Sequence, residues 1–111
     1  LTRAFATTIP KIVMMITLYR VESSRTVRYY SISDRQGDLF SPFTFTASWG
    51  TALSKGQEKN FAFRTRQEMD EKLRELIGKR IRSGYRVLYT FFRANEYEGI
   101  RDVLARSSQV S

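Results

Sequence analysis

The segment from Phe43 to Trp49 alternates apolar and polar residues more clearly than the rest of the chain. Phe43, Phe45, Ala47 and Trp49 share one side of an extended strand, and threonine or serine fills each position between them. Successive side chains of a strand point to opposite faces of a sheet, so this pattern predicts a strand with one packed face. The eight phenylalanines and six tyrosines of the chain also favour a sheet with a packed face.

The same two-residue period predicts four further strands. Residues 16–21 and 26–33 flank a polar break and can pair as a hairpin. A loop follows over residues 34–42, and residues 58–64 return as a strand after the turn that ends the alternating segment. Residues 86–92 are predicted as the last strand. Its odd-numbered and even-numbered positions are both largely apolar, which is typical of a strand covered on both faces.

A long helix is predicted between residues 65 and 83. Thr65 and Glu68 match a capping box, in which each side chain bonds a free backbone N–H at the start of the helix. Gly84 is a natural C-terminal end. A weaker cap signal at Asn95, followed by spaced apolar residues, predicts a short C-terminal helix. The apolar stripe of the long helix consists of Met69, Leu73, Leu76, Ile77 and Ile81.

The chain contains no cysteine and no histidine. Disulfide bonds and thiolate nucleophiles are therefore excluded, and the commonest general base and metal ligand are missing. We expect a protein that is not an enzyme and has no catalytic residues, no metal site and no cofactor.

Lysine and arginine outnumber aspartate and glutamate by 19 to 11, which gives a formal net charge of +8. Such an excess is typical of proteins with a polyanionic partner, such as nucleic acid or an acidic protein, although small domains also carry it for solubility alone. No apolar run approaches the roughly 18–20 residues that span a bilayer. The expected location is the cytoplasm, with no membrane partner.

A series of short motifs follows one another along the chain: Leu18-Tyr19, Arg28-Tyr29-Tyr30, Gly37-Asp38-Leu39-Phe40, Trp49-Gly50, Gly56-Gln57 and Lys79-Arg80-x-Arg82-x-Gly84-Tyr85-Arg86. Together they resemble the WGR domain, a module of DNA-damage-responsive poly(ADP-ribose) polymerases and of many bacterial proteins. The resemblance runs from about Ile16 to Arg86 and is closest to the bacterial, stand-alone form.

The resemblance implies an α+β fold: an antiparallel, twisted sheet of about five strands with one long helix packed on a face and a short C-terminal helix. The predicted strands and helices are compatible with this architecture. We expect one WGR-like domain over residues 1–111. Its family-like core would be residues 16–86, and residues 1–14 would be an extension that is flexible or not native.

Two positions depart from the family signature. Its arginine is Thr51 in this chain, and its next glycine is Leu53. In the polymerases, the tryptophan and arginine region helps to grip a DNA 5′ end, so by resemblance Trp49 can stack on a terminal sugar. Thr51 cannot make the paired, charge-assisted hydrogen bonds of an arginine, and the side chain of Leu53 disfavours a positive φ. We therefore expect weakened binding to DNA ends, with Lys55 able to restore one charge.

Trp49 has two interpretations. It shares a face with Phe43, Phe45 and Ala47, which favours burial in the core. It also ends its strand beside Gly50, where its ring can lie half exposed and act as a stacking platform for a sugar or a base.

The end of the long helix also has two interpretations, a solvated surface or a phosphate-binding site. Acidic residues neutralise the first half of the helix through pairs such as Glu68–Lys72 and Glu75–Lys79, whereas the last turn has none. Tyr85 either seals the helix against the sheet or bonds a phosphate together with Arg86. The predicted nucleic-acid-binding residues are Trp49, Gly50, Lys55, Lys79, Arg80, Arg82, Tyr85 and Arg86.

The sequence thus predicts a non-catalytic nucleic-acid-binding module of WGR type, with mainly phosphate-backbone contacts and DNA as the expected nucleic acid. The alternative is a protein–protein interaction module with no nucleic-acid binding and an acidic protein as its partner. The missing signature arginine and the aromatic residues Phe40, Phe43 and Phe92 motivate that alternative.

Overall fold

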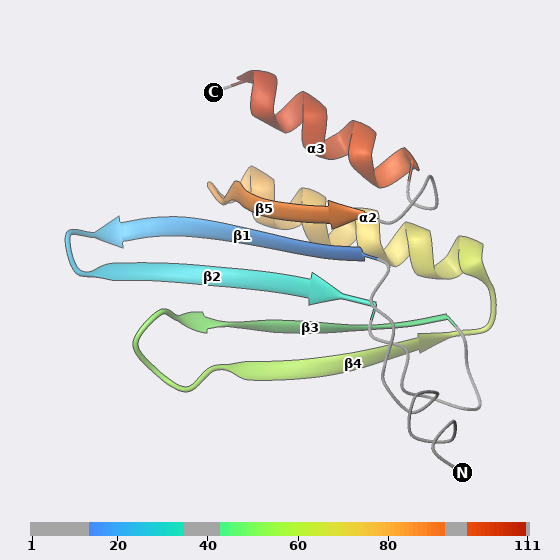
Figure 1. The fold of residues 1–111 in the computed structure, drawn as a ribbon, viewed down its shortest axis with the longest axis horizontal. Helices are drawn as coiled ribbons and strands as arrows, with labels where there is room; N and C mark the ends of the chain where they lie inside the picture. Colours follow the sequence, from blue (N-terminus) through green and yellow to red (C-terminus); the bar gives the residue numbers. More distant parts are fainter. Residues whose placement is uncertain (1–13, 35–42, 93–97, 111) are drawn as a thin grey trace, which may run out of the picture.

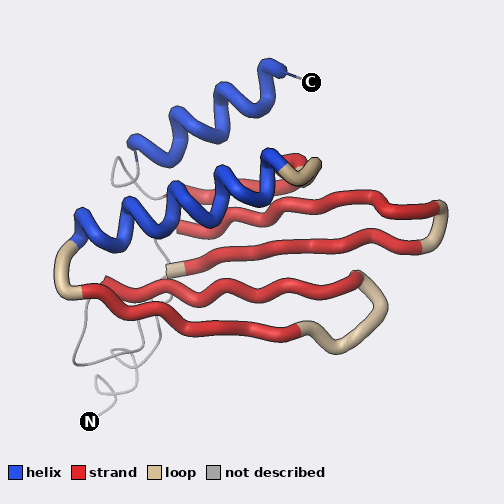
Figure 2. Tube along the Cα trace, turned by 180° about the vertical axis from the view of Figure 1, so that it is seen from behind, coloured by secondary structure: helices blue, strands red, loops and turns tan. Residues whose placement is uncertain are grey.

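The computed structural model describes residues 14–34, 43–92 and 98–110. Five strands form one antiparallel sheet in the order β4-β3-β2-β1-β5, and helix α2 crosses one face of it (Figures 1 and 2). The predicted α+β fold is confirmed, including the long helix and the shorter C-terminal one. In chain order the elements are β1 (Met14–Ser23), β2 (Thr26–Ser33), β3 (Phe43–Thr51), β4 (Gln57–Phe63), α2 (Arg66–Arg82), β5 (Arg86–Phe92) and α3 (Glu98–Val110).

Several predicted features lie outside the described residues. They are the loop over residues 35–42 with its Gly37-Asp38-Leu39-Phe40 motif, the cap at Asn95, and residues 1–13. Met14, which the sequence analysis placed at the end of the N-terminal extension, is fully buried in β1. Its backbone N–H donates to the Asp34 carboxylate over 2.8 Å, and the Asp34 N–H donates to the Met14 carbonyl over 3.2 Å.

The two faces of the sheet follow from the strand register. Leu18, Tyr30 and Trp49 are cross-strand neighbours, and their side chains lie on the face covered by α2. The other face carries rows of small polar side chains, such as Thr17 and Ser31, whose hydroxyl groups lie 3.0 Å apart. The buried hydrophobic core consists of Met14, Ile16, Leu18, Tyr30, Ile32, Phe45, Ala47, Met69, Leu73, Ile77, Tyr85, Ile100 and Leu104.

Helix α2 begins and ends as its sequence predicts. The Glu68 N–H donates to the Thr65 hydroxyl over 3.1 Å, and the Glu68 carboxylate accepts from the Arg64 N–H over 3.2 Å. This is a capping box whose second bond reaches one residue further back than the usual pattern. At the other end Gly84 takes a positive φ of 104°, a conformation that favours glycine.

The ion pairs along α2 differ from those predicted. Within the described residues, Arg66 pairs with Asp70 at 3.3 Å and Lys72 with Glu75 at 3.3 Å, in place of Glu68–Lys72 and Glu75–Lys79. Glu68 is held by the cap, which explains why it does not reach along the helix. Lys79 consequently has no carboxylate partner within the described part of the chain, so the last turn keeps its full positive charge.

The prediction that residues 86–92 are covered on both faces is wrong. Strand β5 pairs only with β1, so it is an edge strand of the sheet. Its register shifts between Thr17 and Leu18 of β1, and Leu88, at this irregularity, is 64% exposed. Helix α3 lies beside β5 and α2, where Ile100 and Leu104 are buried (Figure 1).

The two hairpins, β1–β2 and β3–β4, extend past the C-terminal end of α2 (Figures 1 and 2). Side chains on the helix-covered face are therefore packed near the middle of the sheet and uncovered near the hairpin ends. Neither helix that the structure describes is long and apolar enough to cross a membrane.

Candidate nucleic-acid interface

Trp49 lies where the cover of α2 ends. Its side chain is only partly buried and packs against the edge of the core, so each of the two interpretations of this residue holds in part. The indole stacks on the ring of Tyr30, the neighbouring residue of β2, with 6.2 Å between ring centroids and 29° between planes. The Trp49 residue as a whole keeps partial contact with solvent, which is compatible with contact to a ligand.

Arg80 joins the end of α2 to this aromatic pair. Its guanidinium carbon lies 4.2 Å from the ring centroid of Tyr30 and 5.6 Å from that of Tyr85, distances typical of cation–π contacts. Burial raises the pKa of Tyr30 above its ordinary value, and the charge and hydrogen bond of Arg80 oppose that rise. Arg80 is thus fixed by aromatic faces, and its charge has no carboxylate partner in the described residues.

The two glycines of the signature hold the end of the β3–β4 hairpin against Tyr29. A Cβ added at Gly56 would lie on the Tyr29 hydroxyl and 2.5 Å from the Trp49 carbonyl oxygen, and a Cβ at Gly50 would lie 2.9 Å from the Gly56 Cα. Gly50 also has a positive φ of 156°. Both positions therefore require glycine, and their role is to shape the hairpin beside Trp49.

The turn of this hairpin carries Lys55 and Leu53, both exposed. Thr51, at the position of the signature arginine, hydrogen-bonds the Ser54 hydroxyl within the turn. The Thr51 side chain is therefore engaged locally, whereas Lys55 is free to meet an anion.

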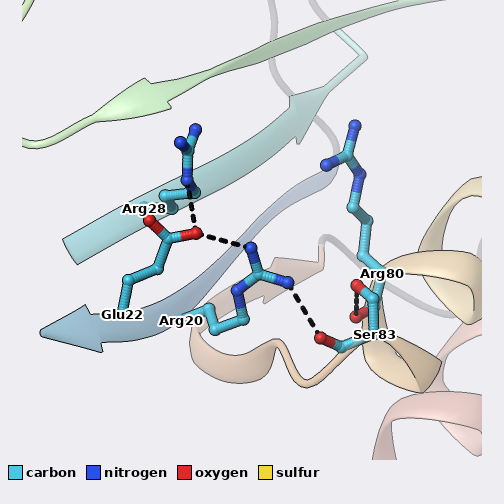
Figure 3. A network of polar contacts seen from close by, with 5 residues as sticks. All are labelled: Arg20, Glu22, Arg28, Arg80 and Ser83. Atoms are coloured by element: carbon cyan, nitrogen blue, oxygen red, sulfur yellow. Dashed lines mark hydrogen bonds and ion pairs between the residues drawn. The ribbon is translucent and has the colours of Figure 1, made fainter. Parts of the chain in front are cut away.

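A polar network that the sequence did not predict lies next to Arg80 (Figure 3). One oxygen of Glu22 accepts hydrogen bonds from Arg20 at 2.7 Å and from Arg28 at 2.6 Å, and these bonds, that of Arg20 first, lower the pKa of Glu22. Arg20 also donates to the Ser83 carbonyl over 2.9 Å and lies 5.0 Å from the Tyr85 ring centroid. The one sequence signal for this network was the two-residue period of the strands. It places Arg20 and Arg28 on the same face of the sheet as Trp49.

The structure separates the remaining predicted site residues. Lys79 and Arg82 are exposed on α2, and Arg82 lies back over Gly78, 3.1 Å from where a Cβ of that glycine would be. Arg86 pairs with Tyr19, whose neighbours in β1 face α2, so Arg86 belongs to the opposite face of the sheet from Trp49. Tyr85 is only 5% exposed. It packs beneath Arg20 and Arg80 and seals the helix end, and it does not form part of the open surface.

We call the resulting surface the arginine–aromatic patch, formed by Arg20, Arg28, Trp49 and Arg80 around the buried ring of Tyr30. Two lysines extend it along the sheet: the Lys59 and Lys72 ammonium groups lie 5.1 Å and 6.0 Å from the ring centroid of Phe61. Glu22 is the one carboxylate in ion-pair contact with the patch within the described ranges. The patch thus places guanidinium groups near a partly buried indole.

A five-stranded antiparallel sheet with one covering helix and a partly buried Trp-Gly strand end defines a small α+β module with basic and aromatic side chains together at one site. The profile of the WGR domain matches residues 14–91, and this chain belongs to the WGR domain family. WGR domains are known as modules of a nucleic-acid-binding type. No match was found among curated proteins or among solved structures.

Proposed function

We propose that this protein is a non-catalytic module that binds nucleic acid, with DNA as its main target, through phosphate-backbone contacts at the arginine–aromatic patch. The observation that supports this most strongly is that Arg80 is held on the faces of Tyr30 and Tyr85, beside Trp49, without a neutralising carboxylate in the described residues. A fixed guanidinium and a partly exposed tryptophan together suit a phosphate that carries a sugar or a base.

The charge balance supports a polyanion. The chain carries a net charge of +8, and the patch holds three guanidinium groups against the one carboxylate of Glu22. Each backbone phosphate that such a surface neutralises releases condensed counterions, so binding must weaken as salt is added. Because we expect the arginines to contact mainly backbone phosphates, which carry no sequence information, we expect little sequence preference.

The experiment is a titration of the protein with a short duplex DNA at several salt concentrations, followed by fluorescence anisotropy of the labelled DNA. We expect the logarithm of the affinity to fall linearly with the logarithm of salt, with a slope of about 0.9 per phosphate contacted. Absence of binding to duplex DNA, single-stranded DNA and RNA at low salt would refute the proposal.

One observation favours the alternative, a protein–protein interaction module with an acidic partner. Edge strand β5 exposes Leu88, Tyr89 and Phe91, which are 64%, 51% and 40% accessible. The aromatic residues that first motivated this alternative do not supply such a surface, since Phe43 and Phe92 pack against the core and Phe40 lies outside the described residues. Exposed apolar side chains on an edge strand suit the addition of a partner's strand.

The two functions are separated by a competition between labelled duplex DNA and a polyglutamate peptide of equal charge. A nucleic-acid module prefers the duplex, because stacking on Trp49 adds to the hydrogen bonds and charge attraction between arginine and phosphate. Equal or stronger binding of the peptide, abolished by replacing Leu88 with glutamate, would favour the acidic protein partner instead.

A further inference from the structure

Glu22 has an unusual position for a carboxylate on a basic surface. A single oxygen, Oε2, accepts one hydrogen bond from Arg20 and one from Arg28, which come from two different strands. The Glu22 and Arg20 side chains are each 32% exposed, and that of Arg28 is 44% exposed, so the contact is open to solvent. Figure 3 shows the Glu22 carboxylate joined to both Arg28 and Arg20, with Arg80 on the other side of Arg20.

Arg28 occupies a particular place in the sheet. It is the direct cross-strand partner of Thr51, the position at which the WGR signature has an arginine. Residues in directly opposed positions of an antiparallel pair have neighbouring Cβ atoms. Strand β2 therefore supplies a guanidinium next to the site where strand β3 lacks one.

The two arginines differ in how they are held. Arg20 keeps two other contacts, a hydrogen bond to the Ser83 carbonyl and the ring of Tyr85, so its guanidinium stays in place without Glu22. Among the described residues, Glu22 has hydrogen-bond and ion-pair partners in the two arginines alone, and ion pairs as exposed as these contribute little to stability. The carboxylate can therefore leave at small cost. A phosphate oxygen that takes its place meets Arg20 already held, and it replaces Glu22 as the partner of Arg28.

We propose that Arg20 and Arg28 form a phosphate-binding site that Glu22 fills in the free protein and vacates when nucleic acid binds. The proposal rests on the proposed function and adds residues to it that the WGR motif does not contain. Two guanidinium donors that converge on one carboxylate oxygen suit a phosphate oxygen equally well. A phosphate brings the same negative charge or more, so the exchange leaves neither arginine unpaired.

The test compares Glu22→Gln with Glu71→Gln. Both changes remove one negative charge at a partly or fully exposed site, but Glu71 lies on the first half of α2, away from the patch. If Glu22 competes with phosphate, Glu22→Gln binds duplex DNA about two- to fivefold more tightly than Glu71→Gln does. If Glu22 instead positions the arginines for the ligand, Glu22→Gln binds more weakly, and the proposal is overturned. Equal affinities of the two variants overturn it as well.

A second variant identifies the site itself. Adding Arg28→Met to Glu22→Gln should abolish the gain, because the converging donors are then gone. A gain that persists without Arg28 contradicts the assignment. Urea unfolding of each variant verifies that all of them are folded at the temperature of the binding assay.

The same binding assay is carried out with duplexes that have 5′-hydroxyl ends and with duplexes that have 5′-phosphate ends. This comparison separates a terminal phosphate from an internal phosphodiester as the group that is bound. A larger gain for the phosphorylated ends assigns the site to a terminal phosphate, and an equal gain assigns it to an internal phosphodiester.

The site can also be tested without nucleic acid, so its failure is distinguishable from failure of the proposed function. Inorganic pyrophosphate is titrated while the Nε–H signals of Arg20 and Arg28 are followed by NMR. We expect these signals to shift at a lower pyrophosphate concentration in Glu22→Gln than in the unmodified protein. Signals that respond in neither protein refute the site, whatever the DNA result.

Discussion

At the scale of single residues, Trp49 is the side chain whose surroundings most directly suit a ligand. It is partly buried against the core edge and stacked on Tyr30. Trp49→Ala should weaken binding to single-stranded or frayed DNA by about 1–3 kcal/mol, the typical contribution of one base–aromatic stack. Fluorescence anisotropy measures the loss. Phe91→Ala is the control, since it removes an exposed ring on edge strand β5 and should leave the affinity unchanged. Equal losses in both variants would contradict the stacking role.

Tyr30 gives a prediction that concerns stability. Burial raises its pKa above the ordinary value of 10.0, although Arg80 opposes the rise. Above about pH 10 the unfolded chain therefore loses this proton more readily than the folded one, and the free energy of unfolding falls as pH increases. Tyr30→Phe should make that alkaline decline shallower. Urea unfolding at a series of pH values measures both slopes, and identical slopes would show that Tyr30 titrates alike in the two states.

At the scale of elements, the β3–β4 hairpin and helix α2 respond oppositely to the same substitution. Gly56→Ala places a methyl group against the Tyr29 hydroxyl and the Trp49 carbonyl, and we expect it to destabilise the protein by about 1–3 kcal/mol. Gly78→Ala meets only the flexible Arg82 guanidinium and gains helix propensity, so it should stabilise by up to about 1 kcal/mol. Urea unfolding compares the two. A neutral Gly56→Ala would mean that Tyr29 does not pack on the hairpin as described.

The elements themselves were largely predictable from sequence because their signals are local. The alternation around Phe45 and the cap at Thr65 each depend on residues a few positions apart. The error at β5 has a physical reason: Leu88, Tyr89 and Phe91 are apolar on the uncovered side of an edge strand, so composition alone suggested cover that the topology does not provide.

The candidate site was predictable only in part. Trp49 and Arg80 were found from motif and charge, and they do meet, through Tyr30. The network of Arg20, Glu22 and Arg28 was missed because it depends on the register of the β1–β2 hairpin and on where α2 ends, which no short window of sequence specifies.

At the scale of the whole molecule, the question is whether nucleic-acid binding depends on the total positive charge or on the position of particular arginines. The net charge of +8 attracts any polyanion from a distance, whichever face carries it. The fold, however, places Arg80 beside Trp49 and Arg86 on the other face of the sheet. Location and total charge therefore make different predictions for two substitutions that remove one arginine each.

The most direct measurement is the salt dependence of duplex DNA binding for the unmodified protein, Arg80→Met and Arg86→Met. We predict that Arg80→Met lowers the affinity and reduces the log–log salt slope by about 0.9, the contribution of one phosphate contact. Arg86→Met should leave the slope unchanged within error and weaken binding only slightly. If the two variants lose the same affinity and the same slope, the arginine–aromatic patch is not where nucleic acid binds.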